Sequence, residues 1–462
     1  MDQSSSSASG NGRTWLYVKA VTMRVLMRIG MFFHGFPHIL ATKPSFRRTI
    51  SPTTAIGPNE KITLNFFVPE NYHKERRLGK RYPVVVNFHG GGFTLGKATD
   101  DYVWILKVVE TTNAVVVSVD YRLAPEHPFP TAVDDGVDAL LYLESKADEL
   151  SLDITRVVLT GFSSGGNLVF TVPYRLRYGR ASNMSLIDLH KPRTRPQTTG
   201  ASYFNSQSPS SSSSPESSAG YSPNHDLSNV EAQLPPTVPE QSNEDGNSSD
   251  PSDPFQSPKS GLKHDHDLHR ELTISQAQVY PVDHENGSYL SLPSQFSPHD
   301  PNNLPLRDAR SPNSRLRIVG IFSWYPLLDF VLPRSLRRVR SENPDKTLAP
   351  FLTNLFDESY APVISDRYSP FASPGRASEQ FIRESLPDHI FMYICQWDML
   401  FLEAQELVHK LQKTGKQVRS MMMERTTHAW DKSVNPFRDK QQIDIIYEDA
   451  CYEMRRLLES DE

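Results

Sequence analysis

The sequence predicts an α/β fold in which a mostly parallel, twisted sheet has helices on both faces. Two observations support this prediction. Short apolar, β-branched runs bounded by Pro or Gly recur along the chain, which is typical of buried strands. Segments with the apolar spacing of helices lie between these runs, and strand–helix alternation indicates a parallel sheet.

Each element follows from its local pattern. The predicted strands are 61–69 (an outer strand), 82–88, 114–119, 156–160, 316–324, 388–396 and 418–424. The predicted helices are 131–145, 165–178, 402–412 and 441–458. Pro173 falls inside the second of these helices, but the flanking residues keep the helical pattern. Residues 330–386 are irregular and rich in Pro and Arg, so we expect them to form part of a lid.

A polar segment interrupts the pattern. Hydrophobic residues make up only 37% of the 462-residue chain, below the usual globular share. The deficit is concentrated in residues 181–314, which are rich in Ser, Pro, Asn and Asp. Such a segment buries too little apolar surface to offset an ordering entropy of about 1–2 kcal/mol per residue. We therefore expect a disordered insertion at 181–314 between two parts of one domain, 61–180 and 315–462, preceded by an N-terminal region, 1–60.

Charge and cysteine content exclude several classes of protein. The net charge of −5 does not indicate a nucleic-acid-binding protein. Two cysteines cannot form a disulfide framework, and no Cys/His spacing indicates a zinc site. The cluster His264, His266 and His269 resembles a metal-binding tract, but it falls in the polar segment, so no metal site is predicted. The polar N-terminus does not resemble a secretory signal. The sequence thus predicts an intracellular protein, either cytoplasmic or membrane-associated, and leaves a signal-anchor open.

The N-terminal region is basic and partly helical in pattern. Its first 50 residues contain seven basic residues against one acidic residue. On a helix, three of the basic residues share one face, and the large apolar residues fall roughly opposite: Arg13, Arg24 and Arg28 against Trp15, Val18, Val25, Leu26, Ile29 and Phe33. The favoured interpretation is a cap helix whose apolar face covers the main domain. The alternative is peripheral membrane contact through residues 14–40.

The strongest chemical motif is the pentapeptide that runs from Gly161 to Gly165. It follows a predicted strand and precedes a predicted helix, which is the context of the Gly-x-Ser-x-Gly nucleophile turn. Such a turn is tight and strained, so that the serine hydroxyl projects above the sheet edge. Small residues two before and two after the serine allow the strand and the helix to approach closely. This register selects Ser163 and not Ser164 as the nucleophile.

A second motif, His89-Gly90-Gly91-Gly92, ends the predicted strand 82–88. Acyl transfer builds negative charge on a carbonyl oxygen, and fixed backbone N–H groups stabilise that charge best. Glycines let the main chain come close to a substrate and turn its amides inward. We expect the N–H groups of Gly91, Gly92 and Ser164 to form an oxyanion hole. A phosphate loop is the alternative, but the Gly-Lys-Ser/Thr ending of such a loop is missing.

A serine nucleophile needs a base, and the base needs an orienting carboxylate. In enzymes built around this turn the chain order is Ser, then acid, then His. Asp398 follows the predicted strand 388–396, and His428 follows the strand 418–424, so both would lie at the strand ends where parallel sheets place their sites. The rival candidates are Asp329, Glu403 and Glu406 as acids and His389 and His409 as bases.

These motifs together resemble the hormone-sensitive-lipase-like family of α/β hydrolases, which includes carboxylesterases related to arylacetamide deacetylase. The resemblance covers roughly residues 60–180 and 315–460. It is carried by 89–92, by the run Asp-Tyr-Arg-Leu-Ala-Pro-Glu-His-Pro-Phe-Pro at 120–130, by Gly-Phe-Ser-Ser-Gly-Gly-Asn at 161–167, and by Asp398 and His428. The chain departs from the family at Phe162, where Asp is usual, at Ser164, where Ala is usual, and after the histidine, at Ala429 and Trp430.

The resemblance implies an α/β-hydrolase fold with an N-terminal cap and hydrolysis of carboxylic esters without a cofactor. The substrate would be a small-molecule or lipid ester. Two alternatives stay open: a non-catalytic member that binds a small molecule or a partner, and an amidase or acyltransferase with the same triad. The sequence leaves the natural ester and the oligomeric state undetermined.

Overall fold

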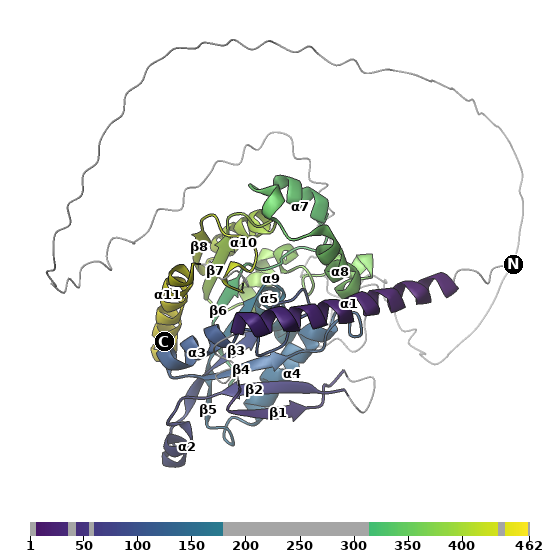
Figure 1. Cartoon of the computed structure of the whole chain (residues 1–462). Helices are drawn as coiled ribbons and strands as arrows, with labels where there is room; N and C mark the ends of the chain where they lie inside the picture. The colour runs from purple at the N-terminus through teal and green to yellow at the C-terminus, as the bar shows by residue number, and fades with distance from the viewer. Residues whose placement is uncertain (1–5, 36–42, 55–59, 179–313, 433–438, 461–462) are drawn as a thin grey trace, which may run out of the picture. The chain divides into compact units, whose positions relative to one another are not determined.

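The computed structural model describes residues 6–35, 43–54, 60–178, 314–432 and 439–460. The described residues form an eight-stranded sheet in the order β1-β2-β4-β3-β5-β6-β7-β8 (Figure 1). The strands are β1 (Phe46–Ile50), β2 (Ile62–Phe67), β3 (Tyr82–Phe88), β4 (Val115–Asp120), β5 (Leu152–Phe162), β6 (Ile318–Trp324), β7 (His389–Cys395) and β8 (Gln417–Met423). β2 runs antiparallel to both β1 and β4, and every pair from β4 to β8 is parallel.

Helices cover both faces of this sheet. The longer ones are α1 (Ser6–Gly35), α3 (Tyr102–Thr112), α4 (Thr131–Ser145), α5 (Ser164–Tyr178), α8 (Pro350–Tyr360), α10 (Phe401–Lys413) and α11 (Lys440–Glu459). Short helices are α2 (Tyr72–Glu75), α7 (Arg334–Arg340) and α9 (Glu379–Ser385). Side chains of α4, α5 and α10 share one apolar cluster with the sheet, and those of α3 and α11 share a second cluster. The prediction of an α/β fold with a mostly parallel sheet and helices on both faces is confirmed.

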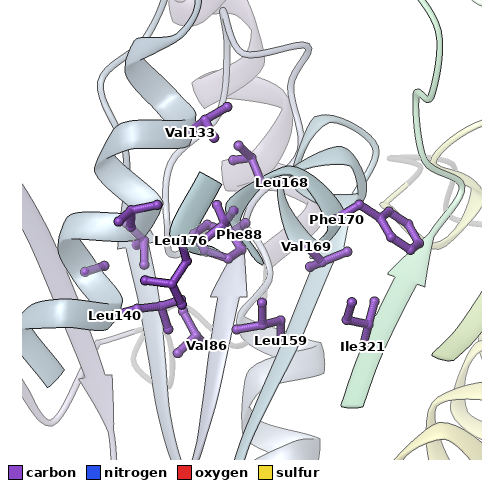
Figure 2. Packing of buried hydrophobic residues seen from close by; sticks show 14 of the residues in the cluster. Val86, Phe88, Val133, Leu140, Leu159, Leu168, Val169, Phe170, Leu176 and Ile321 are labelled. Atoms are coloured by element: carbon purple, nitrogen blue, oxygen red, sulfur yellow. The ribbon is translucent and has the colours of Figure 1, made fainter. Parts of the chain in front are cut away.

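The alternation of side chains along β3 shows how the sheet separates the two cores. Val84, Val86 and Phe88 belong to the first cluster, whereas Val85 belongs to the second. Successive strand residues point to opposite faces, and both faces here are covered, so an unbroken apolar run is required. The labelled residues of Figure 2 show the first core between α4, α5 and the strands: Val133, Leu140, Leu168, Val169, Phe170, Leu176, Val86, Phe88, Leu159 and Ile321.

Several elements differ from the sequence-based expectations. β1 lies in the segment assigned to the N-terminal region, and because it pairs outside β2, the strand predicted at 61–69 is not the edge of the sheet. The helix α3 was not predicted. The segment expected to be an irregular lid contains α7, α8 and α9. The insertion predicted at 181–314 lies outside the described residues, except for Ser314.

Helix α1 lies against the main domain, but with a different face from the one predicted. Leu16 and Ala20 are buried and pack with Leu355 of α8, and Met23 joins them. Five of the large apolar side chains that were expected to cover the domain are exposed instead: Trp15, Val18, Val25, Leu26 and Ile29. The sixth, Phe33, lies outside the described side chains. The interpretation of α1 as a cap that buries its broad apolar face is therefore wrong. Across the described residues, no helix is both long enough and apolar enough to span a bilayer.

Candidate active site

Ser163 occupies a tight turn between β5 and α5. Its φ of +54° is left-handed, a region that non-glycine residues enter only under strain. A Cβ atom on Gly161 would lie 2.3 Å from the carbonyl oxygen of Gly165, and one on Gly165 would lie 1.9 Å from that of Phe88. Both positions therefore exclude any side chain. The Ser163 N–H donates to the Trp324 carbonyl at 2.9 Å, which ties the turn to β6.

Three residues from three different loops meet above the sheet. His428 Nε2 lies 2.8 Å from Ser163 Oγ, and His428 Nδ1 lies 2.6 Å from Asp398 Oδ2. The backbone N–H of Leu400 donates to the other Asp398 oxygen at 3.1 Å. Asp398 is 2% exposed, so its carboxylate is held by these partners rather than by solvent. The structure thus brings together the three residues that the sequence singled out as nucleophile, acid and base.

The rival candidates have other partners or lie in other elements. Asp329 pairs with Arg376 at 3.1 Å, and Glu403 pairs with Arg337 at 3.1 Å. Glu403 also accepts a hydrogen bond from the Leu328 N–H at 2.7 Å. Burial raises the pKa of Glu403 to about 7. The remaining rivals sit in regular elements: Glu406 and His409 in α10 and His389 at the start of β7.

The glycine loop after β3 lies beside the nucleophile. A Cβ atom on Gly90 would be 3.5 Å from the Cβ of Ser163. Gly91 and Gly92 have φ angles of +119° and +61°, which glycine adopts without strain. Within the described residues, neither of their N–H groups donates to a main-chain acceptor. The first residues of a helix also leave their N–H groups free, and Ser164 begins α5.

The sheet topology explains why these loops meet. β3 lies between β4 and β5 in the sheet. The connection after β3 therefore leads to β4 on one side of it, whereas β5 and the later strands lie on its other side. The carboxyl ends of two such neighbouring strands form the crevice in which open α/β sheets bind ligands. His89 begins the loop at the end of β3. Its ring stacks on Tyr121 at 4.2 Å, and its carbonyl accepts from the Tyr121 hydroxyl at 2.8 Å.

A buried carboxylate anchors the segment that follows His428. Asp431 accepts hydrogen bonds from the hydroxyls of Tyr325, at 2.6 Å, and Tyr447, at 2.5 Å. The Tyr325 ring packs edge-on against the His428 ring at 5.0 Å. Burial, together with the Asp431 charge, raises the pKa of Tyr325 well above its ordinary value, so this phenol stays a donor. No sequence motif marked these residues, because they lie far apart along the chain.

Lys432 contacts Phe162, the residue that precedes the nucleophile. Its Nζ is 2.6 Å from Asp101 and 3.5 Å from the centre of the Phe162 ring. Burial would lower the pKa of Lys432, but the Asp101 and Asp431 carboxylates raise it above its ordinary value. The aromatic face of Phe162 therefore contacts a cation where the resembled family usually has an acid. The departure from the family at Phe162 was visible in the sequence, but nothing there pointed to Lys432 as its partner.

Comparison with known proteins places this arrangement in a family. A family model described as alpha/beta hydrolase fold matches residues 85–229 and 304–432. The chain belongs to the α/β-hydrolase family. The resemblance to its hormone-sensitive-lipase-like members is confirmed, because the chain is similar to their carboxylesterase and arylacetamide-deacetylase-like relatives.

Three relatives of this α/β hydrolase show the extent of the similarity. Carboxylesterase NlhH of Mycobacterium tuberculosis is 49% identical over 19% of this chain and 27% of its own length. Carboxylesterase 20 of Arabidopsis thaliana is 36% identical over 30% of this chain and 46% of its own. Human arylacetamide deacetylase-like 2 is 35% identical over 28% and 31%, respectively. The matches thus span less than half of each relative.

Solved structures share the fold of this α/β hydrolase. The esterase of Pyrobaculum calidifontis has a TM-score of 0.55 and 17% identity, covering 97% of this chain and 98% of that one. Carboxyl esterase 2 of Tuber melanosporum has a TM-score of 0.51 and 14% identity, covering 89% and 87%. At such low identity the likeness concerns the fold alone.

Proposed function

We propose that this protein hydrolyses carboxylic esters through an acyl-enzyme on Ser163. The observation that carries the proposal is the continuous pair of short contacts from Ser163 Oγ through the His428 ring to Asp398, at 2.8 and 2.6 Å. A serine hydroxyl hydrogen-bonded to an imidazole, which a buried carboxylate orients, is the arrangement of nucleophilic acyl transfer. The carboxylesterases among the relatives support an ester as the substrate class.

The reaction would proceed in two halves. His428 Nε2 accepts the Ser163 proton while Oγ attacks the ester carbonyl, and the resulting imidazolium donates that proton to the departing alcohol. Water then gives a proton to His428 and its oxygen adds to the acyl carbon. The carboxylic acid leaves as Ser163 Oγ regains a proton. Asp398 keeps Nδ1 protonated throughout, so that Nε2 is the basic nitrogen.

The oxyanion would be held by the backbone N–H groups of Gly91, Gly92 and Ser164. Support comes from the free amides of the loop and of the α5 terminus, and from the closeness of Gly90 to the nucleophile. Loss of one such donor costs on the order of 3 kcal/mol in the barrier. Because these donors belong to the main chain, Ser164 acts through its amide and not through its hydroxyl.

The test is the exchange Ser163→Ala in the full chain. Hydrolysis of a short p-nitrophenyl ester should fall by at least about 10⁴-fold in kcat, and labelling by a fluorophosphonate probe should disappear. The matched control is Ser145→Ala, an exposed serine of α4, which should keep both signals. An unlabelled wild-type protein that is folded would instead favour a non-catalytic, ligand-binding member of the fold.

A further inference from the structure

Helix α1 presents an apolar surface to solvent. Besides Tyr17, six large apolar side chains on it are exposed, and Trp15 is the most exposed of them, at 60%. We call them the outer face of α1: Trp15, Val18, Val21, Val25, Leu26 and Ile29. At 100° per residue, Val18, Val25 and Ile29 point almost directly away from Leu16 and Ala20, which are buried. A surface helix normally has the opposite arrangement, with polar residues outside.

The inner side of α1 is held in a fixed orientation, so the outer face cannot simply rotate inward. Arg24 donates to the Thr94 and Ala124 carbonyls, at 2.8 Å each. It also donates to both carboxylate oxygens of Glu126, at 2.6 and 2.8 Å. Arg13 donates to the Pro125 carbonyl at 3.0 Å. Bidentate arginine contacts of this kind fix geometry as well as adding energy.

Basic side chains border the outer face on both sides. Lys19 and Arg28 are exposed, and the helical wheel places them roughly 90° to either side of the centre of the outer face. Residues 3–59 contain seven basic residues and no acidic one. A small pocket between α1 and the loop after β3 is lined by Lys97, Arg24 and Arg28 together with one acid, Asp100. An apolar stripe with Trp and flanking Lys and Arg is typical of helices that lie in a bilayer interface.

α1 is also connected to the candidate active site. Its residues Leu16 and Ala20 pack against Leu355 of α8, which lies beside α1 in Figure 1. A Cβ atom on Gly92 would lie 2.2 Å from the Phe356 ring, so α8 rests directly on the glycine loop. Phe351 of α8, one turn before Leu355, is also exposed. The outer face therefore lies over the part of the molecule that contains this loop.

We propose that the outer face of α1 docks on a bilayer surface that contains anionic lipid, with the helix lying in the interface. The charge of the segment distinguishes this partner from a second copy of the chain, since two such basic surfaces would repel each other. Lipid phosphates and carboxylates complement the flanking Lys19 and Arg28. Docking does not depend on the proposed esterase activity, but it would bring the glycine loop close to lipid-borne substrates.

The test measures co-sedimentation of the full chain with vesicles of phosphatidylcholine, alone or mixed with phosphatidylserine. We expect binding to the mixed vesicles that weakens as salt screens the charges. The outer-face variant changes Trp15, Val18, Val25 and Ile29 to Ser and should lower the partition coefficient by at least about tenfold. Lys19→Gln and Arg28→Gln should each lower it roughly fivefold on mixed vesicles only.

The control removes three apolar residues elsewhere that are 48–80% exposed: Leu78, Ile445 and Tyr452, each changed to Ser. It should bind like the wild type, and Ser163→Ala should also bind normally, which separates docking from catalysis. Equal binding by the outer-face variant and the wild type would overturn the proposal. A wild-type protein that binds neither kind of vesicle would overturn it as well. This holds also if the wild type forms a dimer that the outer-face variant cannot form.

Discussion

The close approach of β5, α5 and β3 at the nucleophile turn can be tested by adding a single methyl group. In Gly165→Ala the new Cβ would lie 1.9 Å from the Phe88 carbonyl oxygen and 2.8 Å from that of His89. Both contacts are with backbone atoms, which cannot rotate away. Because ordinary contact begins near 3.4 Å, α5 and the end of β3 must separate by about 1.5 Å.

That displacement moves Ser163 away from the glycine loop, because the clash lies between the helix that follows the nucleophile and the strand that precedes Gly90. A misplacement of about 1 Å can cost roughly 10²-fold in rate, and overpacking of a close contact costs about 1–3 kcal/mol in stability. We therefore expect kcat/KM for a short p-nitrophenyl ester to fall about 10²-fold or more while the chain still folds.

Two other glycines provide matched controls. In Gly320→Ala the Cβ meets the flexible end of Leu457 at 2.7 Å, on a part of β6 remote from the turn. This variant should lose some stability and keep its kcat/KM. Gly12→Ala meets nothing within 4 Å and should be neutral or slightly stabilising in a helix. Steady-state kinetics and thermal melts on all three variants refute the steric argument if Gly165→Ala hydrolyses the ester as fast as the wild type.

Two further predictions concern buried carboxylates. Asp431→Asn should lower the free energy of unfolding by about 2–4 kcal/mol, because hydrogen bonds to charged groups contribute about 1.5–3 kcal/mol each. It should also reduce kcat more than it changes KM, because Tyr325 packs on His428. A thermal melt and steady-state kinetics that show neither change would contradict the anchoring role of Asp431. The pKa of Glu403 is about 7 in the folded chain against an ordinary 4.5, so between these pH values the folded state binds more protons than the unfolded state. The contribution of Glu403 to the free energy of unfolding therefore declines, by up to about 3 kcal/mol, as pH rises from 4.5 to 7. In urea titrations, the free energy of unfolding of Glu403→Gln should therefore depend less on pH than that of the wild type, although Arg337 then lacks a counter-charge. An unchanged pH dependence would exclude proton uptake by Glu403 on folding.

Local patterns predicted much of the fold. Apolar β-branched runs identify the central strands because both faces of a parallel sheet are buried, and β3 begins and ends where its run does. The pattern fails where this condition is relaxed. β1 pairs at the edge of the sheet and has three consecutive exposed polar residues between its apolar ends, so its sequence Phe-Arg-Arg-Thr-Ile lacks the apolar run of a central strand.

The three residues of the candidate triad were predictable for a topological reason. A tight turn marks Ser163, and parallel strands bring the loops after them to one edge, so chain order together with a place just after a predicted strand favoured Asp398 and His428 over their rivals. The support around them was not predictable. Tyr325, Asp431 and Tyr447 contact one another through side chains from separate elements, and no local pattern records such contacts. The orientation of α1 was predicted wrongly because the apolar side of a helix was assumed to face the protein.

The pairing of β5 with β6 has a practical consequence. These strands are paired although residues 179–313 lie between them in the sequence. Glu144 of α4 accepts hydrogen bonds from Ser314 and Leu316, just before β6. Ser163 is in the first piece, and Asp398 and His428 are in the second. Two separately expressed pieces, 1–178 and 314–462, would each lack part of the triad, so ester hydrolysis on mixing them would report their association. The same chain is thus a natural starting point for a split-enzyme sensor.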